Sequence, residues 1–156
     1  MFRTLIATAA TAATLATSAL AADVNLKPGF NVNTGTVYAK NVGADKSGRF
    51  LATVGCSAQG AATCPDPAAA DIAPYQNPAF PNVATIKFKP LGGMKTAKHT
   101  FPFFGGLAWG PGTYVLTVCV DAGNHQAETN EGDNCQRFVK KVKRPAIGAT
   151  KFKPAR

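Results

Sequence analysis

Residues 112–142 constrain the fold more than any other stretch, because two alternating segments there flank a loop crowded with Asn, Asp and Glu. Successive side chains point to opposite faces of a β-strand. Four large apolar residues of the first segment therefore share a core-facing side: Tyr114, Leu116, Val118 and Val120. Cys119 and Cys135 fall on the other side and are symmetric about residue 127. The pattern predicts a β-hairpin that carries a disulfide on its outer face.

The same alternation predicts the other strands. Eleven Pro and fifteen Gly residues divide the chain into short runs with little sign of helix. We expect strands at Asp23–Leu26, Thr34–Val42, Arg49–Cys56, Val83–Lys89, Lys95–Phe103 and Thr113–Asp121, before the return strand that starts near Cys135. Their inward residues should be Val37, Ala39, Phe50, Ala52, Val54, Ala84, Ile86, Phe88, Ala97, His99, Phe101 and Phe103. A turn is expected at Lys27-Pro28-Gly29.

Seven short antiparallel strands at this spacing predict an all-β fold, an immunoglobulin-like sandwich. A small closed barrel is the alternative. Ser57–Asn82 contains five prolines and cannot be a central strand, because proline lacks the N–H group that a sheet requires. We expect it to be one long loop. Loops of this length are usually functional or mobile.

The first 21 residues are typical of a secretory signal peptide. Arg3 supplies a positive start, residues 5–20 are uncharged and apolar or small, and Ala19-Leu20-Ala21 is a small-x-small cleavage pattern. A transmembrane anchor is the alternative, but this stretch of mostly Ala and Thr is shorter than the roughly 20 apolar residues of a span. We therefore expect a signal peptide (1–21), one domain (22–143) and a basic tail (144–156). The mature protein should be secreted or periplasmic, without a membrane span.

The four cysteines favour disulfides, because an even number in an exported chain usually forms them. Cys56 and Cys64 are separated by seven residues and Cys119 and Cys135 by fifteen, so neither pair has the short spacing of a zinc site. We expect the pairs Cys56–Cys64 and Cys119–Cys135. A bond from Cys56 to Cys119 is the alternative. No metal or other cofactor is expected.

Basic residues gather at the end of the chain. The formal net charge is +9, and the last seventeen residues contain seven Lys or Arg and no Asp or Glu. One interpretation is a final strand followed by a solvated end. The other is contact with an anionic partner, an envelope glycan or a protein rather than nucleic acid. The candidate contacts are Lys140, Lys141, Lys143, Arg144, Lys151, Lys153 and Arg156. Tyr75, Phe80, Phe104 and Trp109 could add a second, aromatic contact surface.

The hairpin resembles the signature of the CARDB family, the cell-adhesion-related domain found in bacteria. The family pattern is G-x-Y, alternating apolar residues, V-D, two residues, N, and then E-x-N-E-x-x-N. It is matched at Tyr114, Asp121, Asn124, Glu128, Asn130, Glu131 and Asn134. Residues 37–43 resemble the V-x-V-x-N-x-G strand end of the family, and 91–93 its Leu-x-x-Gly turn. The resemblance implies an immunoglobulin-like sandwich in an exported adhesion or binding protein. The long Pro-rich loop, the cysteines and Asp133 depart from the family pattern.

The polar hairpin loop has two interpretations. Asn and Asp tolerate left-handed backbone and form Asx turns, which gives the loop a structural role. Its oxygen ligands could instead bind calcium, although their spacing differs from that of an EF-hand.

No catalytic motif is recognisable in the sequence. His99 is expected to be a strand residue and His125 a solvated loop residue. We therefore expect a noncatalytic binding or adhesion module. The alternative is a small accessory protein of the envelope that docks onto a larger complex.

Overall fold

The computed structural model describes residues 22–106 and 109–143. Its strands are β1 (Leu26–Asn31), β2 (Thr36–Asn41), β3 (Phe50–Gln59), β4 (Ala84–Phe88), β5 (Thr96–Thr100), β6 (Gly112–Val120) and β7 (Cys135–Val142). The helical turns are α1 (Ala69–Ile72), η1 (Ala73–Tyr75), α2 (Pro102–Gly106) and η2 (Glu131–Asp133). Nearly all regular structure is therefore β, as the alternation predicts.

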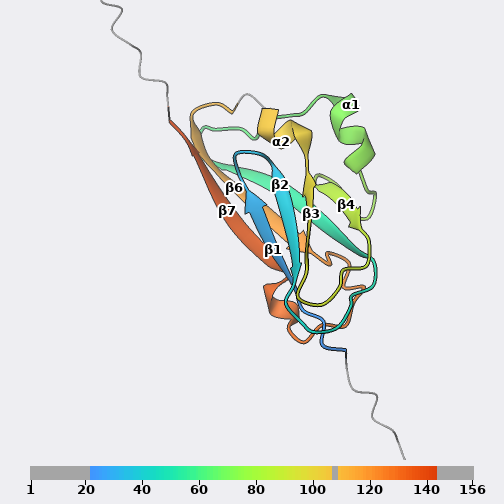
Figure 1. The fold of residues 1–156 in the computed structure, drawn as a ribbon. Coiled ribbons are helices and arrows are strands. Elements are labelled where there is room, and N and C mark those ends of the chain that lie inside the picture. The colour runs from blue at the N-terminus through green and yellow to red at the C-terminus, as the bar shows by residue number, and fades with distance from the viewer. Residues whose placement is uncertain (1–21, 107–108, 144–156) are drawn as a thin grey trace, which may run out of the picture.

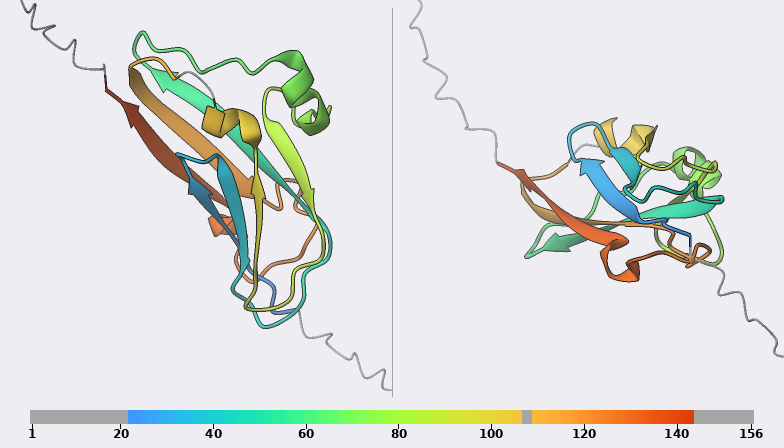
Figure 2. Two further views of the ribbon diagram at one scale, coloured as in Figure 1. Left: turned by 45° about the horizontal axis from the view of Figure 1, so that its top comes forward. Right: turned by 60° about the horizontal axis from the view of Figure 1, so that its bottom comes forward.

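Two antiparallel sheets form a sandwich (Figure 1). One sheet has the strand order β1-β2-β5, and the other has the order β4-β3-β6-β7. Figure 2 shows the two layers from further directions, with α1 and α2 at the end opposite the β6–β7 loop. The expected immunoglobulin-like sandwich of seven strands is confirmed.

The core lies between the sheets and consists of the residues that the period-two pattern selects. Tyr114, Leu116, Val118 and Val120 are at most 1% exposed, and Phe50, Ala52 and Val54 are equally buried. Phe50 stacks on Phe88 of the neighbouring strand at a ring separation of 5.3 Å. Burial of this apolar surface is the main term that favours folding.

One buried side-chain amide, at the last residue of β2, connects the loops at that end of the sandwich. Asn41 is 1% exposed, and its Nδ2 donates to the carbonyl oxygens of Asp45 and Leu91. Its Oδ1 accepts from the N–H group of Gly43. A Cβ atom on Gly43 would lie 2.1 Å from the Asp23 carbonyl oxygen, so no larger residue fits there. This explains why the strand ends in the pattern Asn-x-Gly.

Several expected boundaries were wrong. Lys27-Pro28-Gly29 lies inside β1 and is not a turn, because Pro28 sits on an edge strand where its missing N–H group is tolerated. The expected strand Lys95–Phe103 ends at Thr100, and the chain then enters α2 with Pro102 at its first position. Phe103 is therefore a helical residue.

The long segment 57–82 is not wholly a loop. Its first residues extend β3 as far as Gln59, and α1 and η1 follow. Thr85 lies between the inward residues Ala84 and Ile86, so the alternation predicts that it faces solvent, but it is buried. The segment that precedes β4 passes over this side of the sheet, where Val83 approaches Gly55.

Candidate functional site

The β6–β7 loop is organised around Asp121, which is fully buried where β6 ends. Its carboxylate accepts from the N–H groups of His125 (3.0 Å) and Gln126 (2.8 Å). Its carbonyl oxygen accepts from the N–H group of Asn124 (2.8 Å). Asp121 and Asn124 have φ values of 48° and 47°, a left-handed conformation that Asp and Asn adopt more readily than most residues. Their residue types thus follow from the shape of the turn.

The middle of this loop closes onto the first strand. Glu128 Oε2 accepts from the N–H group of Leu26, and the N–H group of Thr129 donates to the Val24 carbonyl oxygen at 2.8 Å. Glu131 supports this arrangement, because its carboxylate accepts from the Glu128 N–H group. Strands that are distant in sequence are thereby joined across one end of the sandwich.

The end of the loop is capped by Asn130. Its Oδ1 accepts from the N–H group of Gly132 at the start of η2, and its Nδ2 donates to Asp133. Asp133 also forms an ion pair of 2.9 Å with Lys27. Asn134 is buried, and its Nδ2 donates to Glu131 Oε2 at 3.0 Å.

Each carboxylate of this loop is therefore engaged by a donor of the protein. Among residues 22–106 and 109–143, no group of three or more His, Cys, Asp or Glu side chains is arranged to hold a metal ion. The contacts support the structural interpretation of the loop, and the calcium alternative receives no support from them.

The pKa of Glu128, in the middle of the loop, is strongly raised. Partial burial, with the neighbouring carboxylates Glu131 and Asp121 adding repulsion, raises the pKa of Glu128 from 4.5 to about 7, against the hydrogen bond from Leu26. Its Oε1 and the Oδ1 of Asn134 are buried without a hydrogen-bond partner among the described residues. Protonation of Glu128 would supply a hydrogen-bond donor where two acceptor oxygens now lack one.

The raised pKa predicts a pH-dependent stability. The folded state holds a proton on Glu128 more tightly than the unfolded chain, so the free energy of unfolding should fall as pH rises from about 4.5 to about 7. If the whole pKa shift acted on stability, the free energy of unfolding would change by about 3 kcal/mol. Solvent screening of this partly exposed group reduces the expected effect to about 1 kcal/mol. Urea unfolding at a series of pH values measures it.

Glu128→Gln is the matched variant for that experiment. It keeps an oxygen for the Leu26 N–H group and adds donors beside Asn134, so it should be more stable than the wild type at pH 8. Its stability should change less between pH 4.5 and 7. An unchanged slope in this variant would show that another group titrates.

The histidines lie where the sequence places them. His99 is a partly exposed strand residue that contacts Phe101 (5.0 Å between rings) and Tyr75 (5.6 Å). Burial lowers its pKa. His125 is exposed in the loop. Ser47 is buried, and its hydroxyl accepts from the N–H group of Leu91. These contacts are those of packed or solvated residues.

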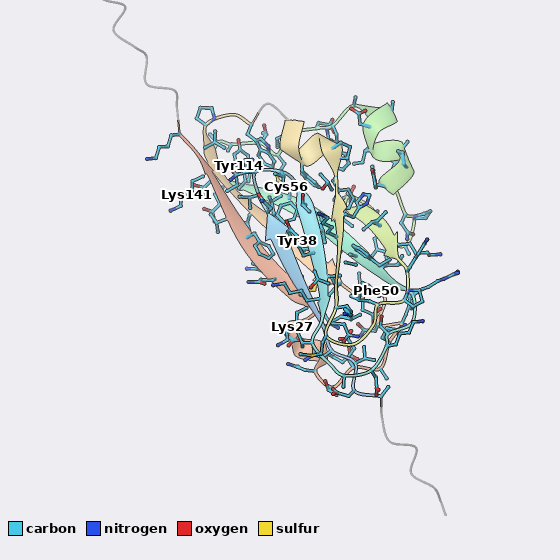
Figure 3. The ribbon with its side chains drawn as sticks, viewed as in Figure 1. Lys27, Tyr38, Phe50, Cys56, Tyr114 and Lys141 are labelled. Carbon is cyan, nitrogen blue, oxygen red and sulfur yellow. A yellow bond between two sulfur atoms is a disulfide. The ribbon has the colours of Figure 1, made fainter. Side chains whose placement is uncertain are left out.

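The candidate basic surface is only partly as expected. Lys141 and Lys143 are exposed, and Lys141 extends outward from β7 (Figure 3). Lys140 instead points to the inner side of β7, where its ammonium donates to the Val32 carbonyl oxygen (2.8 Å) and lies 4.7 Å from the ring centre of Trp109. Burial lowers the pKa of Lys140. These contacts make Lys140 less available to a partner than Lys141 or Lys143, and its role as a partner contact stays a prediction.

The remaining basic candidates lie outside the described residues: Arg144, Lys151, Lys153 and Arg156. The cleavage residues Ala19 and Ala21 also lie outside them. Among the described residues, no helix is long and apolar enough to cross a membrane.

The aromatic candidates do not form one exposed surface. Phe104 is 7% exposed and belongs to the core, and Tyr75 packs against Phe101 at a ring separation of 4.9 Å. Trp109 packs edge-on against Tyr114 at 4.7 Å, and the Tyr114 hydroxyl donates to the Gly110 carbonyl oxygen. The aromatic residues therefore mainly close the α1–α2 end of the sandwich.

Both expected disulfides are present. Cys119 and Cys135 join β6 to β7 across the hairpin, with their Cα atoms 4.1 Å apart. Cys56 and Cys64 join the end of β3 to the segment that follows, with a Cα separation of 6.1 Å. The second bond fixes the start of the Pro-rich segment against the sheet.

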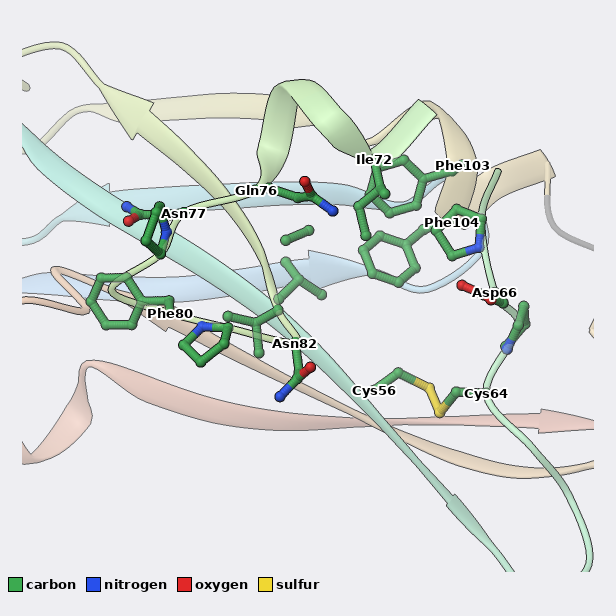
Figure 4. A pocket seen from close by; sticks show the side chains of 17 residues that line it. Cys56, Cys64, Asp66, Ile72, Gln76, Asn77, Phe80, Asn82, Phe103 and Phe104 are labelled. Atoms are coloured by element: carbon green, nitrogen blue, oxygen red, sulfur yellow. A yellow bond between two sulfur atoms is a disulfide. The ribbon is translucent and has the colours of Figure 1, made fainter. Parts of the chain in front are cut away.

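Beneath the Pro-rich segment lies a hollow of about 620 Å³ that the strand pattern did not predict (Figure 4). Phe103 and Phe104 of α2 and Ile72 of α1 supply much of its apolar lining. Asp66 is the one ionisable side chain among its lining residues. The only sequence signal for this hollow was the unusual length and proline content of the segment.

A solved structure with a similar fold is a domain of a protein from Methanosarcina acetivorans described as a cell surface protein. It is 21% identical, the match covers 79% of this chain and 93% of that one, and the TM-score is 0.50. A CARDB domain from Pyrococcus furiosus, crystallised in complex with di-metal ions, is 17% identical over 77% of this chain and 85% of its own, with a TM-score of 0.45. A solution structure of the same CARDB domain is 18% identical over 78% of this chain and 93% of its own, with a TM-score of 0.38.

The β-sandwich fold is similar to that of the Methanosarcina domain. At these identities the likeness concerns the fold alone. No family model matches the sequence, and no curated protein matches it. In this fold the motif residues of the CARDB signature gather in the β6–β7 loop and in the tyrosine contact at the start of β6, as the preceding contacts describe.

Proposed function

We infer that the protein is a noncatalytic binding domain that acts outside the cytoplasm and contacts an anionic partner through β7 and the basic residues that follow it. The observation that carries this proposal is the outer side of β7, where Arg137, Lys141 and, just beyond the strand, Lys143 are exposed and where no acidic side chain intervenes. Opposite charges across an interface accelerate encounter and select the partner.

Two further observations support the location. Disulfides form in oxidising compartments, and this domain has two. One structure of similar fold is a domain of a protein described as a cell surface protein. The partner is an envelope glycan or a protein, and the sequence adds further basic residues after β7, within 144–156. The apolar hollow beside Phe103 favours a second candidate function, docking as an accessory protein onto a larger complex.

Charge reversal tests the proposal. We expect the double variant R137E/K141E to reduce retention of envelope components at low salt by at least tenfold, because contacts between exposed charges weaken with loss of charge and with added salt. Pull-down from envelope fractions at low and high salt measures the effect. Removal of residues 144–156 should weaken retention in the same direction.

The matched control is K87E/K89E. Lys87 lies in β4, the opposite edge strand, and Lys89 follows the end of that strand. Both are exposed, and together they carry the same number of charges as Arg137 and Lys141. If both double variants lose the same retention, the effect depends on net charge alone and not on the β7 surface. Retention that is insensitive to salt and to β7 would refute the proposed surface and favour docking through the hollow.

A further inference from the structure

The outer edge of β7 carries free backbone hydrogen-bonding groups. In an antiparallel pair, residues that exchange hydrogen bonds alternate with residues that do not. The Val120 N–H group donates to the Asn134 carbonyl oxygen at 2.8 Å. This bond shows which opposing residues of β6 and β7 exchange hydrogen bonds. Even-numbered residues of β7 therefore bond to β6. The N–H and C=O groups of Arg137, Val139 and Lys141 point away from the sheet.

The cysteine pair confirms this alternation of hydrogen-bonded and non-hydrogen-bonded pairs. Cys119 and Cys135 face each other with a Cα separation of 4.1 Å, close to the roughly 4.5 Å of a pair without hydrogen bonds. Within residues 22–106 and 109–143, no group forms a hydrogen bond with the outward groups of residues 137, 139 and 141. Figure 1 shows β7 as the last strand of its sheet, with no element beyond it.

The neighbouring edge strand β1 is protected, in contrast to β7. The Val42 N–H group donates to the Asn25 carbonyl oxygen, so even-numbered residues point outward from β1. The hairpin loop bonds to two of these outward groups, the Val24 carbonyl oxygen and the Leu26 N–H group. The next outward residue is Pro28, which has no N–H group. The fold therefore protects the first half of the β1 edge, whereas the β7 edge has no comparable protection among the described residues.

The side chains on the open edge indicate what can pair with it. Val139 is 53% exposed, although it is apolar, and it lies between Arg137 and Lys141 on the same face. A second copy of the chain is disfavoured, because antiparallel pairing about Val139 would place Arg137 of each copy opposite Lys141 of the other. Like charges directly opposite each other destabilise a strand pair. Basic residues on an edge prevent self-association while leaving it open to an acidic strand.

We propose that β7 accepts an extended acidic polypeptide segment as an additional strand of the β4-β3-β6-β7 sheet. The segment places an apolar residue opposite Val139 and acidic residues opposite Arg137 and Lys141. A polypeptide matches this edge better than a glycan, because only a peptide backbone repeats N–H and C=O groups at the spacing of a strand. This proposal rests on the proposed function, which assigns an anionic partner to the same surface.

The test uses a blocked synthetic peptide, Thr-Glu-Thr-Val-Thr-Glu-Thr, and the full mature chain. We expect the peptide to bind and to slow amide hydrogen exchange at residues 137, 139 and 141. Two N-methylated peptides are compared, one modified at the Val and one at the Thr before it. Because alternate N–H groups of a strand point to opposite sides, only one of the two should lose binding, by at least tenfold.

Val139→Pro is the matched change in the protein. It removes one outward N–H group without removing a bond to β6, and it imitates Pro28 of β1. Binding should fall at least tenfold, whereas Val139→Thr should retain it. If Val139→Pro does not fold, the N-methylated peptides alone decide the question.

The outcomes separate the two proposals. Salt-sensitive binding that R137E/K141E abolishes, but that neither N-methylated peptide changes, would overturn strand addition and leave an anionic partner in place. Binding of dextran sulfate in preference to the peptide, unaffected by Val139→Pro, would identify a glycan surface and overturn strand addition as well. Absence of salt-sensitive binding to any of these probes would overturn both.

Discussion

Asp121→Ala is expected to destabilise the protein by about 4 kcal/mol, the largest effect of any single polar substitution in the loop. The change removes both hydrogen bonds that the buried carboxylate accepts from His125 and Gln126. Hydrogen bonds to charged groups contribute about 1.5–3 kcal/mol each. Alanine must also adopt φ near 48°, which costs about 1 kcal/mol. Urea unfolding at constant pH measures the difference.

Asp121→Asn is the control for that variant. Asparagine keeps one acceptor oxygen and tolerates the left-handed backbone, so it should lose about half as much stability. A loss below about 1 kcal/mol for Asp121→Ala would show that the loop closes without this carboxylate. The contacts from Glu128 and Thr129 to the first strand would then carry the closure.

Phe101→Ala is expected to destabilise the protein by about 3–5 kcal/mol, the usual range for the loss of a buried aromatic side chain. Phe101 is 0% exposed, and its ring contacts those of Tyr75 (4.9 Å), Phe103 (5.6 Å) and Phe104 (5.8 Å). Its removal leaves a cavity where α2 and η1 meet the sheets. Chemical unfolding monitored by circular dichroism measures the loss.

Phe101→Leu separates the cavity from the loss of aromatic contacts. Leucine is smaller than phenylalanine but retains most of the buried area, so Phe101→Leu should lose about half as much stability as Phe101→Ala. Equal losses for Phe101→Leu and Phe101→Ala would contradict a cavity as the cause. The ring contacts themselves would then be the main contribution.

The strand alternation and the cysteine spacing predicted most of the fold. Val37, Val54 and Leu116 fall on the core side because period-two alternation depends only on local geometry. The symmetry of Cys119 and Cys135 about the loop predicted their pairing. Two of the misplaced elements involve proline: Pro28 was expected in a turn but lies on a strand edge, and Pro102 begins a helical turn. Proline fixes φ without specifying which of these structures follows.

The candidate site was less predictable, because it depends on contacts between distant residues. Lys140 could not be assigned to the inner face from a local excess of basic residues, since its partners Val32 and Trp109 come from other parts of the chain. The hollow beneath the Pro-rich segment depends in the same way on Phe103 and Ile72. The sequence could not predict the open edge of β7, because the edge depends on which residues of β7 bond to β6.

The contact between Lys140 and Trp109 gives the domain an intrinsic optical sensor. Trp109 is the only tryptophan of the chain, and the Lys140 ammonium lies 4.7 Å from its ring centre. A nearby positive charge changes the emission energy of an indole. Lys140 is a residue of β7, so its ammonium group moves with that strand. Any event that shifts this strand should therefore change the fluorescence of the unlabelled protein, so occupancy of β7 can be followed in real time.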